Sequence, residues 1–516
     1  MKINFLKLAK CLLFLLAICS LYLTTSIISN AASQKRLVVY YPQWGIYSPA
    51  HHNMVVGQIP WEKVSVINHA FMEVDPSYKI ASIDLWADFD KQMDHSSTEL
   101  KGHFGEYKYY KSKHPEVKII ISIGGWTRGQ NFHAMAATKA NRTIFINSLI
   151  DFLKKYPFID GFDLDWEYPG IDRRPDPNDS NDKGCPGGPE DKKNFTALLQ
   201  EIRAAYNNNN FSHKILSIAA PAGADKAAFQ EPDKYHQYLD YINVMTYDFH
   251  GAWEKVTNHH APLYKNPDDP SPTEPVDIKN TYNTDSAMKL YRDKYHIPAN
   301  KLIAGTPFYS RGWKNVQENT GKNGLYAKAD GAPVGPWDSP TSPGGQYPWY
   351  EIQQNMENKN GYTKFRDEKT RTPYLYNKIT KIMITYEDEI SLKERCDYVN
   401  NNNFGGIIVW EITGDNNNGF PMTSIIYNKI IANNPQPSVK PSASPNPSHK
   451  PSPQPSLNPS PQPSSNPQIK EWKANVNYQV NDLVTYQDKK YKCLQAHTSL
   501  VGWEPNVTPA LWQPIN

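Results

Sequence analysis

Cysteine is scarce in this chain, with five residues among 516. Cys11 and Cys19 lie in an apolar N-terminal run, and the other three, at positions 185, 396 and 493, are far apart. Such a set is a poor disulfide framework, so an exported protein of this length would depend on a large hydrophobic core. No CxxC pair or His/Cys cluster predicts a zinc site. We therefore expect neither a metal nor a cofactor.

A surplus of charge is also missing. The formal net charge is +3, and Lys2, Lys7 and Lys10 account for all of it. The remaining sequence is not basic enough to favour binding of nucleic acid. Beyond the N-terminal run, no second apolar segment has the length of a membrane span. The composition therefore argues against nucleic acid and membrane as partners of the mature protein.

The N-terminus has the three parts of a secretory signal. Basic residues precede the apolar run Cys11–Ile28, and small residues follow at 29–32. An uncleaved membrane anchor is the alternative, because about eighteen apolar residues could just span a bilayer. Polar residues at 24–26 weaken that alternative. We expect a signal peptide over 1–32 and a secreted, extracellular protein.

Aromatic residues, by contrast, are abundant. They make up 12% of the chain, with 13 Trp and 32 Tyr. Aromatic rings stack well on the apolar faces of sugar rings, so this surplus suits a carbohydrate-binding protein, although alone it proves little.

Three acids alternate with bulky apolar residues in the segment 160–167, DGFDLDWE. Strand side chains alternate between faces, so Asp163, Asp165 and Glu167 would project from one face of a strand. A structural strand has no reason to carry three repelling charges. A calcium loop is the alternative, but it wants Asp, Asn, Gly and Ser between the acids, whereas Phe, Leu and Trp separate the acids of this segment. The pattern predicts a buried strand rather than a calcium loop.

Strand-like apolar runs alternate with amphipathic helical segments along most of the chain. A helix is expected from Asn141, as its N-cap, and another over Phe195–Ala205. Eight buried strands separated by helices predict a closed parallel (β/α)8 TIM barrel of the α/β class, whose site lies at the strands' C-terminal ends. The expected strands are 37–41, 64–71, 118–123, the acidic strand, 215–219, 241–247, 302–309 and 404–410.

Composition also predicts the domain boundaries. The barrel would occupy 33–433, and residues 313–381, too long for one crossover, would form a small α+β insertion domain, with a long loop as the alternative. Residues 434–467 are rich in Pro and Ser and predict an extended linker. Residues 468–516 regain aromatic residues and short alternating runs, which predicts a small all-β module.

The acidic segment resembles the DGxDxDxE signature of glycoside hydrolase family 18, which includes many chitinases. Three further segments agree in order: SIGGW at 122–126, MTYD at 245–248 and GIIVWE at 406–411. The resemblance covers about 35–431. It implies that Glu167 is the general acid and base, that Asp165 and Asp163 support it, and that the acetamido group of the substrate is the nucleophile.

The resemblance also implies a set of residues around the sugar. Tyr247 would bond the acetamido group beside Asp248, and Met245 and Trp410 would pack beneath the sugar. Ser122 and Tyr41 would hold the deep Asp163. The remaining cleft-lining candidates are Trp126, Trp253, Arg311 and Trp313, for which packing or simple exposure is an equal alternative.

The C-terminal segment resembles the chitin-binding modules of carbohydrate-binding families 5 and 12. The resemblance implies that Trp503 binds chitin, helped by His497, Thr498 and Pro505. Trp472 and Trp512 are assigned to the core, because so small a domain needs large core aromatics.

These observations together predict a monomeric secreted chitinase that acts on chitin and chitooligosaccharides. Two alternatives stay open: an endo-β-N-acetylglucosaminidase acting on glycans, and a non-catalytic chitin-binding lectin. The presence of Glu167 disfavours the lectin, and the C-terminal segment disfavours the glycan enzyme.

Overall fold

The computed structural model describes residues 35–318, 320–432, 470–474, 476–495, 497–499, 504–509 and 511–515. The expected signal peptide, 1–32, and linker, 434–467, lie outside these residues. The described parts belong to two separate compact units, one before and one after residue 438.

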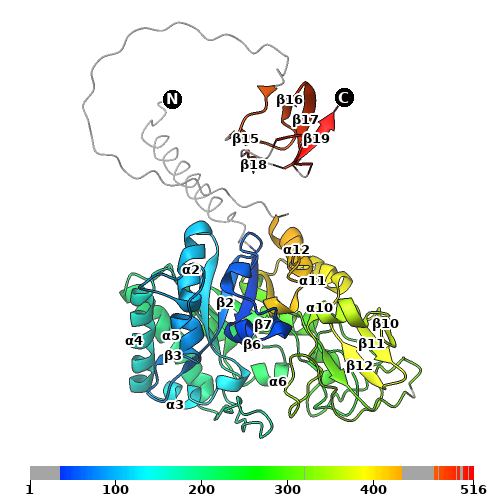
Figure 1. The fold of residues 1–516 in the computed structure, drawn as a ribbon. Coiled ribbons are helices and arrows are strands. Elements are labelled where there is room, and N and C mark those ends of the chain that lie inside the picture. The colour runs from blue at the N-terminus through cyan, green and yellow to red at the C-terminus, as the bar shows by residue number, and fades with distance from the viewer. Residues whose placement is uncertain are drawn as a thin grey trace, which may run out of the picture. The chain divides into compact units, whose positions relative to one another are not determined.

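Eight parallel strands close into a barrel in the first unit (Figure 1), as the sequence predicts. Closure is made by β1, which pairs in parallel with both β2 and β13. A short strand, β3 (Ile80–Ser82), adds antiparallel to β2. The barrel strands are β1 (Arg36–Pro42), β2 (Val66–Val74), β4 (Lys118–Gly124), β5 (Gly161–Asp165), β6 (Ile215–Pro221), β7 (Tyr241–Met245), β8 (Leu302–Pro307) and β13 (Gly406–Trp410).

Helices cover the outer face of the strands. In α5, Leu198, Leu199 and Ile202 are buried, as expected from their helical spacing. In α4 the N-cap is Thr138, whose side chain accepts from the Asn141 N–H, so this helix begins earlier than Asn141, the expected cap. The helices are α2 (Gly102–Lys113), α3 (Phe132–Ala137), α4 (Lys139–Lys155), α5 (Asp191–Asn208), α6 (Ala224–Ala227), α7 (Pro232–Tyr235), α8 (Ile278–Thr281), α9 (Thr284–Lys289), α10 (Trp349–Glu351), α11 (Glu389–Asn401) and α12 (Pro421–Ile426).

An antiparallel sheet stands between β8 and β13 in the sequence. Its order is β10 (Tyr362–Asp367), β11 (Thr372–Asn377), β12 (Ile382–Thr385) and β9 (Arg311–Trp313). It has its own core of aromatic and aliphatic side chains, including Trp313 and Met383. The long segment is therefore folded rather than a loop. Its strands reach from 311 to 385, slightly beyond the expected 313–381.

The second unit consists of short strands around a small aromatic core. One sheet holds β14 (Lys470–Glu471), β16 (Leu483–Tyr486), β17 (Lys489–Cys493) and β19 (Trp512–Ile515), and the other pairs β15 (Asn477–Tyr478) with β18 (His497–Thr498). Trp472 and Trp512 both lie in the core, which confirms their structural assignment.

The three cysteines of the described residues are buried and unpaired, so no disulfide supports either unit there. A search of the same residues for a helix with the length and apolar character of a membrane span found none.

Candidate active site

The predicted site residues gather at the C-terminal ends of the barrel strands. Asp163 and Asp165 lie on β5, and Glu167 follows two residues after that strand ends. Ser122 lies on the neighbouring β4, where it pairs directly with Asp163. Met245 and Trp410 are the last residues of β7 and β13. Eight strand ends converge there, so residues far apart in sequence meet at one site.

Asp163 is the deepest acid and is held by four hydrogen bonds. The hydroxyls of Tyr40 and Ser122 donate to Oδ2 at 2.8 and 2.9 Å. The hydroxyl of Ser217 and the amide of Asn243 donate to Oδ1 at 2.6 and 3.2 Å. Complete burial raises the pKa of Asp163, while the four donors oppose that rise. The carboxyl is thus fixed in position at the bottom of the site.

Asp165 lies between the other two acids. Burial, then the charge of Glu167, then that of Asp163 raise its pKa well above the usual value. Its Oδ1 atom is buried, yet it has no hydrogen-bond partner among the described residues. The raised pKa values of Asp163 and Asp165 favour a proton held among these acids, and one carboxyl oxygen of Asp165 is left to receive a donor.

Glu167 is the acid of this group whose pKa is raised to near neutrality. Its side chain stays partly accessible, but removal of water by the surrounding protein raises its pKa to about 7. A hydrogen bond from Tyr168 and the positive charge of Arg173 oppose the rise, and Asp248 adds to it. Near neutral pH a substantial fraction of this carboxyl keeps its proton.

Tyr247 and Asp248 follow β7 at the same end of the barrel. The charges of Asp165 and Glu167 add to burial in raising the pKa of Tyr247, so its hydroxyl remains a hydrogen-bond donor. Burial alone would raise the pKa of Asp248, but Arg311 holds it well below the usual range. Asp248 is therefore a fixed negative charge beside the acids.

Aromatic rings form one wall of the site. The Trp410 ring stacks on Phe71 with centroids 5.6 Å apart and contacts Tyr40 at 5.3 Å. Trp44 completes the group, 6.4 Å from Trp410. Trp410 keeps one partly accessible surface, which fits its expected role beneath a sugar.

The residues expected near Asp163 need one correction. Tyr41 was expected to hold this acid, but its hydroxyl donates to the Met54 carbonyl at 2.8 Å and lies 3.2 Å from His103 Nε2. The neighbouring Tyr40 contacts Asp163 instead. Adjacent strand residues face opposite sides, so only one of the two tyrosines can point into the barrel.

The weaker cleft candidates divide between surface and core. Trp126 and Trp253 are exposed by 49% and 59%, and the guanidinium of Arg173 stacks 4.0 Å above the Trp126 ring. Trp313, in contrast, is fully buried and its indole N–H donates to the Glu254 carbonyl, so of its two expected places the structure shows packing in the core and not the cleft.

Sequence reasoning missed several residues. Tyr40, Ser217 and Asn243 bind Asp163 from three strands, and only knowledge of which strand residues face the barrel interior could have predicted them.

A stacked, exposed pair of rings, Tyr47 and Trp86, follows β1 and β3. Isolated surface aromatics carry no periodic signal, so nothing in the sequence distinguishes this pair.

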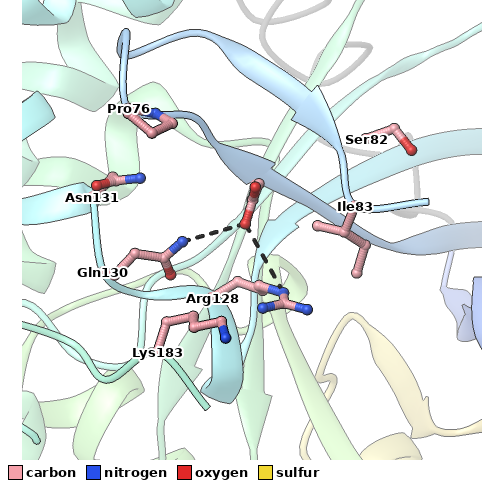
Figure 2. A pocket seen from close by; sticks show the side chains of 8 residues that line it. Pro76, Ser82, Ile83, Arg128, Gln130, Asn131 and Lys183 are labelled. Atoms are coloured by element: carbon pink, nitrogen blue, oxygen red, sulfur yellow. Dashed lines mark hydrogen bonds and ion pairs between the residues drawn. The ribbon is translucent and has the colours of Figure 1, made fainter. Parts of the chain in front are cut away.

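A polar pocket lies at the C-terminal ends of β2 and β4 (Figure 2). The side chains of Gln130 and Arg128 approach the Glu73 carboxylate, at 3.3 and 3.9 Å. Lys183 and Asn131 also line it. Arg128 belongs to the same short turn as Trp126, so the pocket extends the polar surface next to the exposed ring.

In the second unit the expected chitin-binding residues differ in exposure. Thr498 is exposed and His497 half-buried, with its ring 5.2 Å from that of Trp512. Pro505 is buried, which contradicts the surface contact expected of it. Trp503 lies outside the described residues.

Comparison with known proteins agrees with both units. Residues 36–415 match the model of glycosyl hydrolases family 18, and residues 471–513 match carbohydrate-binding module family 5/12. The solved structure of chitinase ChiA74 from Bacillus thuringiensis is similar, with a TM-score of 0.69 and 32% identity, over 77% of this chain and 70% of that one.

Two curated relatives are longer than this chain. Chitinase A1 of Niallia circulans is 35% identical over 446 residues, which cover 79% of this chain and 59% of the relative. Chitinase ChiA of Flavobacterium johnsoniae is 30% identical over 447 residues, which cover 76% of this chain and 28% of the relative. The chain therefore spans about 59% and 28% of these relatives. With a family match over most of its length and the three acids in place on β5 and just after it, the chain belongs to family 18 of the glycosyl hydrolases.

Proposed function

We propose that this protein is a secreted chitinase that hydrolyses β-1,4 bonds between N-acetylglucosamine units with retention of configuration. Family membership, relatives named chitinases and the match to a carbohydrate-binding module support the reaction and the polymer. The basic and apolar composition of residues 1–32 supports export. The observation that carries the mechanism is the buried, unpartnered oxygen of Asp165, next to an acid whose pKa is near neutral.

Glu167 is the proton donor in this proposal. With a pKa of about 7 it can give its proton to the glycosidic oxygen near neutral pH and then, as a carboxylate, take one from water. The acetamido oxygen of the sugar attacks the anomeric carbon from the face opposite the leaving group and forms a ring intermediate. The water then opens this ring from the face that the leaving group occupied. Two displacements at one carbon restore the original configuration.

Asp165 assists the acetamido group. Its free oxygen accepts the N–H of that group and so offsets the positive charge that develops on the ring intermediate. Asp163, fixed by four donors, exchanges the shared proton with Asp165 as charge moves towards the sugar. The Tyr247 hydroxyl, which keeps its proton, bonds the acetamido oxygen from the other side.

Exposed aromatic rings extend the substrate path. Trp126 and Trp253 follow different strands of the barrel, and the pair Tyr47 and Trp86 adds a stacked platform. These four side chains are 48–59% exposed, and an exposed aromatic ring can pack against a pyranose. A long polymer is therefore favoured over a short glycan as the substrate.

The test is a pair of matched substitutions. Glu167→Gln keeps the shape of the side chain but has no proton to give, so hydrolysis of a chitin hexamer should fall by at least about 10³-fold while the hexamer still binds. Glu116→Gln, at an exposed carboxylate before β4, should leave the rate unchanged. Chromatography of the products and calorimetric titration of the hexamer measure both quantities. Retained turnover in Glu167→Gln would refute the assignment.

A further inference from the structure

A buried polar cluster lies on the outer side of the barrel wall, away from the acids. It consists of His69 on β2, Asp88 on the turn η4 (Trp86–Asp90), His103 on α2 and Gln43 in the turn after β1. All four side chains are buried, at most 1% exposed. Within the described residues this is the one set of three His, Cys, Asp or Glu side chains whose ligand atoms lie close enough to share an ion.

The hydrogen-bond acceptors of this cluster outnumber its donors, so the cluster lacks a positive charge. The Tyr41 hydroxyl donates its one hydrogen to the Met54 carbonyl. Its oxygen must therefore accept from His103 Nε2, 3.2 Å away. A neutral His103 then has a bare Nδ1, and this atom lies 3.1 Å from Asp88 Oδ1. Two acceptors face each other there with no hydrogen between them.

Further acceptors converge on the same point. His69 Nε2 also lies 3.1 Å from Asp88 Oδ1. One amide atom of Gln43 lies 3.2 Å from His69 Nε2 and 3.1 Å from both Asp88 oxygens. If that atom is the NH2 group, it satisfies His69 and Asp88 but leaves the contact between His103 and Asp88 unsatisfied. If it is the oxygen, four acceptors meet around one point.

The ligand atoms of His69, Asp88 and His103 all lie within 4.8 Å of one another, which is close enough to share one cation. Nitrogen and oxygen ligands about 2.0–2.2 Å from zinc lie about 3.3–3.5 Å from one another, and the contacts of Asp88 with His69, His103 and Gln43, at 3.1 Å, are slightly shorter. The outer partners also fit. The Nε2–H of His103 donates to Tyr41, His69 Nδ1 lies 3.2 Å from the Tyr107 hydroxyl, and Ser82 donates to Asp88. Metal-bound imidazoles are oriented by partners of this kind.

We propose that His69 Nε2, His103 Nδ1, Asp88 and the Gln43 oxygen bind a divalent zinc-type cation that fastens the barrel wall to α2. Two imidazoles with two oxygens form a ligand set that zinc accepts. With the Gln43 oxygen facing the cluster, one proton satisfies only one acceptor pair, whereas a four-coordinate cation satisfies all four atoms. β2 also carries Phe71, which stacks on Trp410, so the cation would stiffen the strand behind the aromatic wall. No short sequence motif predicts these four ligands, because they come from four separate elements.

The test measures the metal itself. The full chain is unfolded in guanidinium with EDTA, refolded with or without zinc chloride, desalted and analysed by mass spectrometry for first-row metals. About one zinc per chain should remain, and the melting temperature should exceed that of the zinc-free sample by about 2 °C or more. Wild-type protein that keeps less than about 0.1 zinc per chain after refolding in zinc overturns the proposal.

Substitutions locate the ion. His103→Gln and Asp88→Asn should each lose the bound zinc, whereas His114→Gln, at a half-exposed histidine just after α2, should keep it. Folded His103→Gln protein that retains as much zinc as the wild type would place the ion elsewhere and overturn the assignment. If neither variant folds, the wild-type measurement still decides, since a cluster held by a proton retains no metal.

Discussion

Arg311 binds Asp248 through two parallel hydrogen bonds. Its Nε and one terminal nitrogen donate to the two carboxylate oxygens, both at 2.8 Å. Asp248 follows β7 of the barrel and Arg311 begins β9 of the inserted sheet, so this pair ties the two parts together next to the acids. A fork of this geometry is stronger than a single charged contact. It also holds the pKa of Asp248 well below its usual range.

The first prediction concerns the strength of that pair. A double-mutant cycle on unfolding free energy with Arg311→Gln and Asp248→Asn should give a coupling of about 1.5–3 kcal/mol, because both groups are largely shielded from water. The same cycle at Lys429 and Asp397, which form a more exposed pair at 2.7 Å, should give about 0–0.5 kcal/mol. Equal couplings at the two places would show that the shielded position adds nothing.

Much of this arrangement could be predicted from the sequence, for physical reasons. Eight buried apolar runs with helices between them predict a parallel barrel. The acids at 163, 165 and 167 must then lie at the C-terminal ends of its strands. Side-chain parity could not be predicted, since Tyr40 and Tyr41 are identical in type and only the closed barrel decides which faces inward. For the same reason the donors Ser217 and Asn243 were missed.

Local signals also misled at some points. Asn141 is a good cap by residue type, yet Thr138 lies three residues earlier and its hydroxyl takes the role. Trp313 was a candidate for the cleft, but it packs in the core of the inserted sheet. Short-range pattern thus predicted elements well and facing directions poorly.

The second prediction separates the two adjacent tyrosines. Tyr40→Phe removes a donor from the buried Asp163 and should lower kcat on chitin oligomers about 10- to 100-fold, with a loss of about 1–2 kcal/mol of unfolding free energy. Tyr41→Phe removes the bond to Met54 instead, and should cost about 1–2 kcal/mol of unfolding free energy while kcat stays the same. Steady-state kinetics and denaturant titration of both variants check this. The reverse pattern would mean that the assigned facing directions are wrong.

The third prediction is the alkaline limb of activity. Glu167 must carry its proton to act as the acid, and its pKa is about 7, so kcat/KM should fall tenfold per pH unit once the pH rises above about 7. Every variant that keeps Glu167 should still show this fall in kcat/KM at alkaline pH. A profile that stays flat to pH 9 would contradict the role of Glu167 as the acid.

Arg173 offers a directional control on that limb. Its positive charge favours the ionised form of Glu167, so Arg173→Gln should raise the pKa of Glu167 and move the limb to higher pH. Arg292→Gln, at a surface pair with Asp293, should leave the limb in place. Movement towards lower pH in Arg173→Gln would contradict the sign of this interaction.

The fourth prediction assigns the second unit to insoluble substrate. Removing residues 469–516 should reduce the rate on crystalline chitin about tenfold or more and barely change it on soluble hexamer, since tethering raises the local concentration of sites. Trp503→Ala should reproduce most of that loss, whereas a substitution at the buried Pro505 should act only through folding. Equal losses on the two substrates would contradict this division.

The most direct test of the central claim is the configuration of the first product. Hydrolysis of a chitin hexamer, followed by proton NMR before mutarotation, should release new reducing ends as the β-anomer, because the acetamido group of the sugar, aided by Asp165, makes the first displacement and water makes the second. Release of the α-anomer would mean that water attacks the anomeric carbon directly. Asp165 would then not assist an acetamido nucleophile, and Glu167 would not act in turn as acid and base on one face of the sugar.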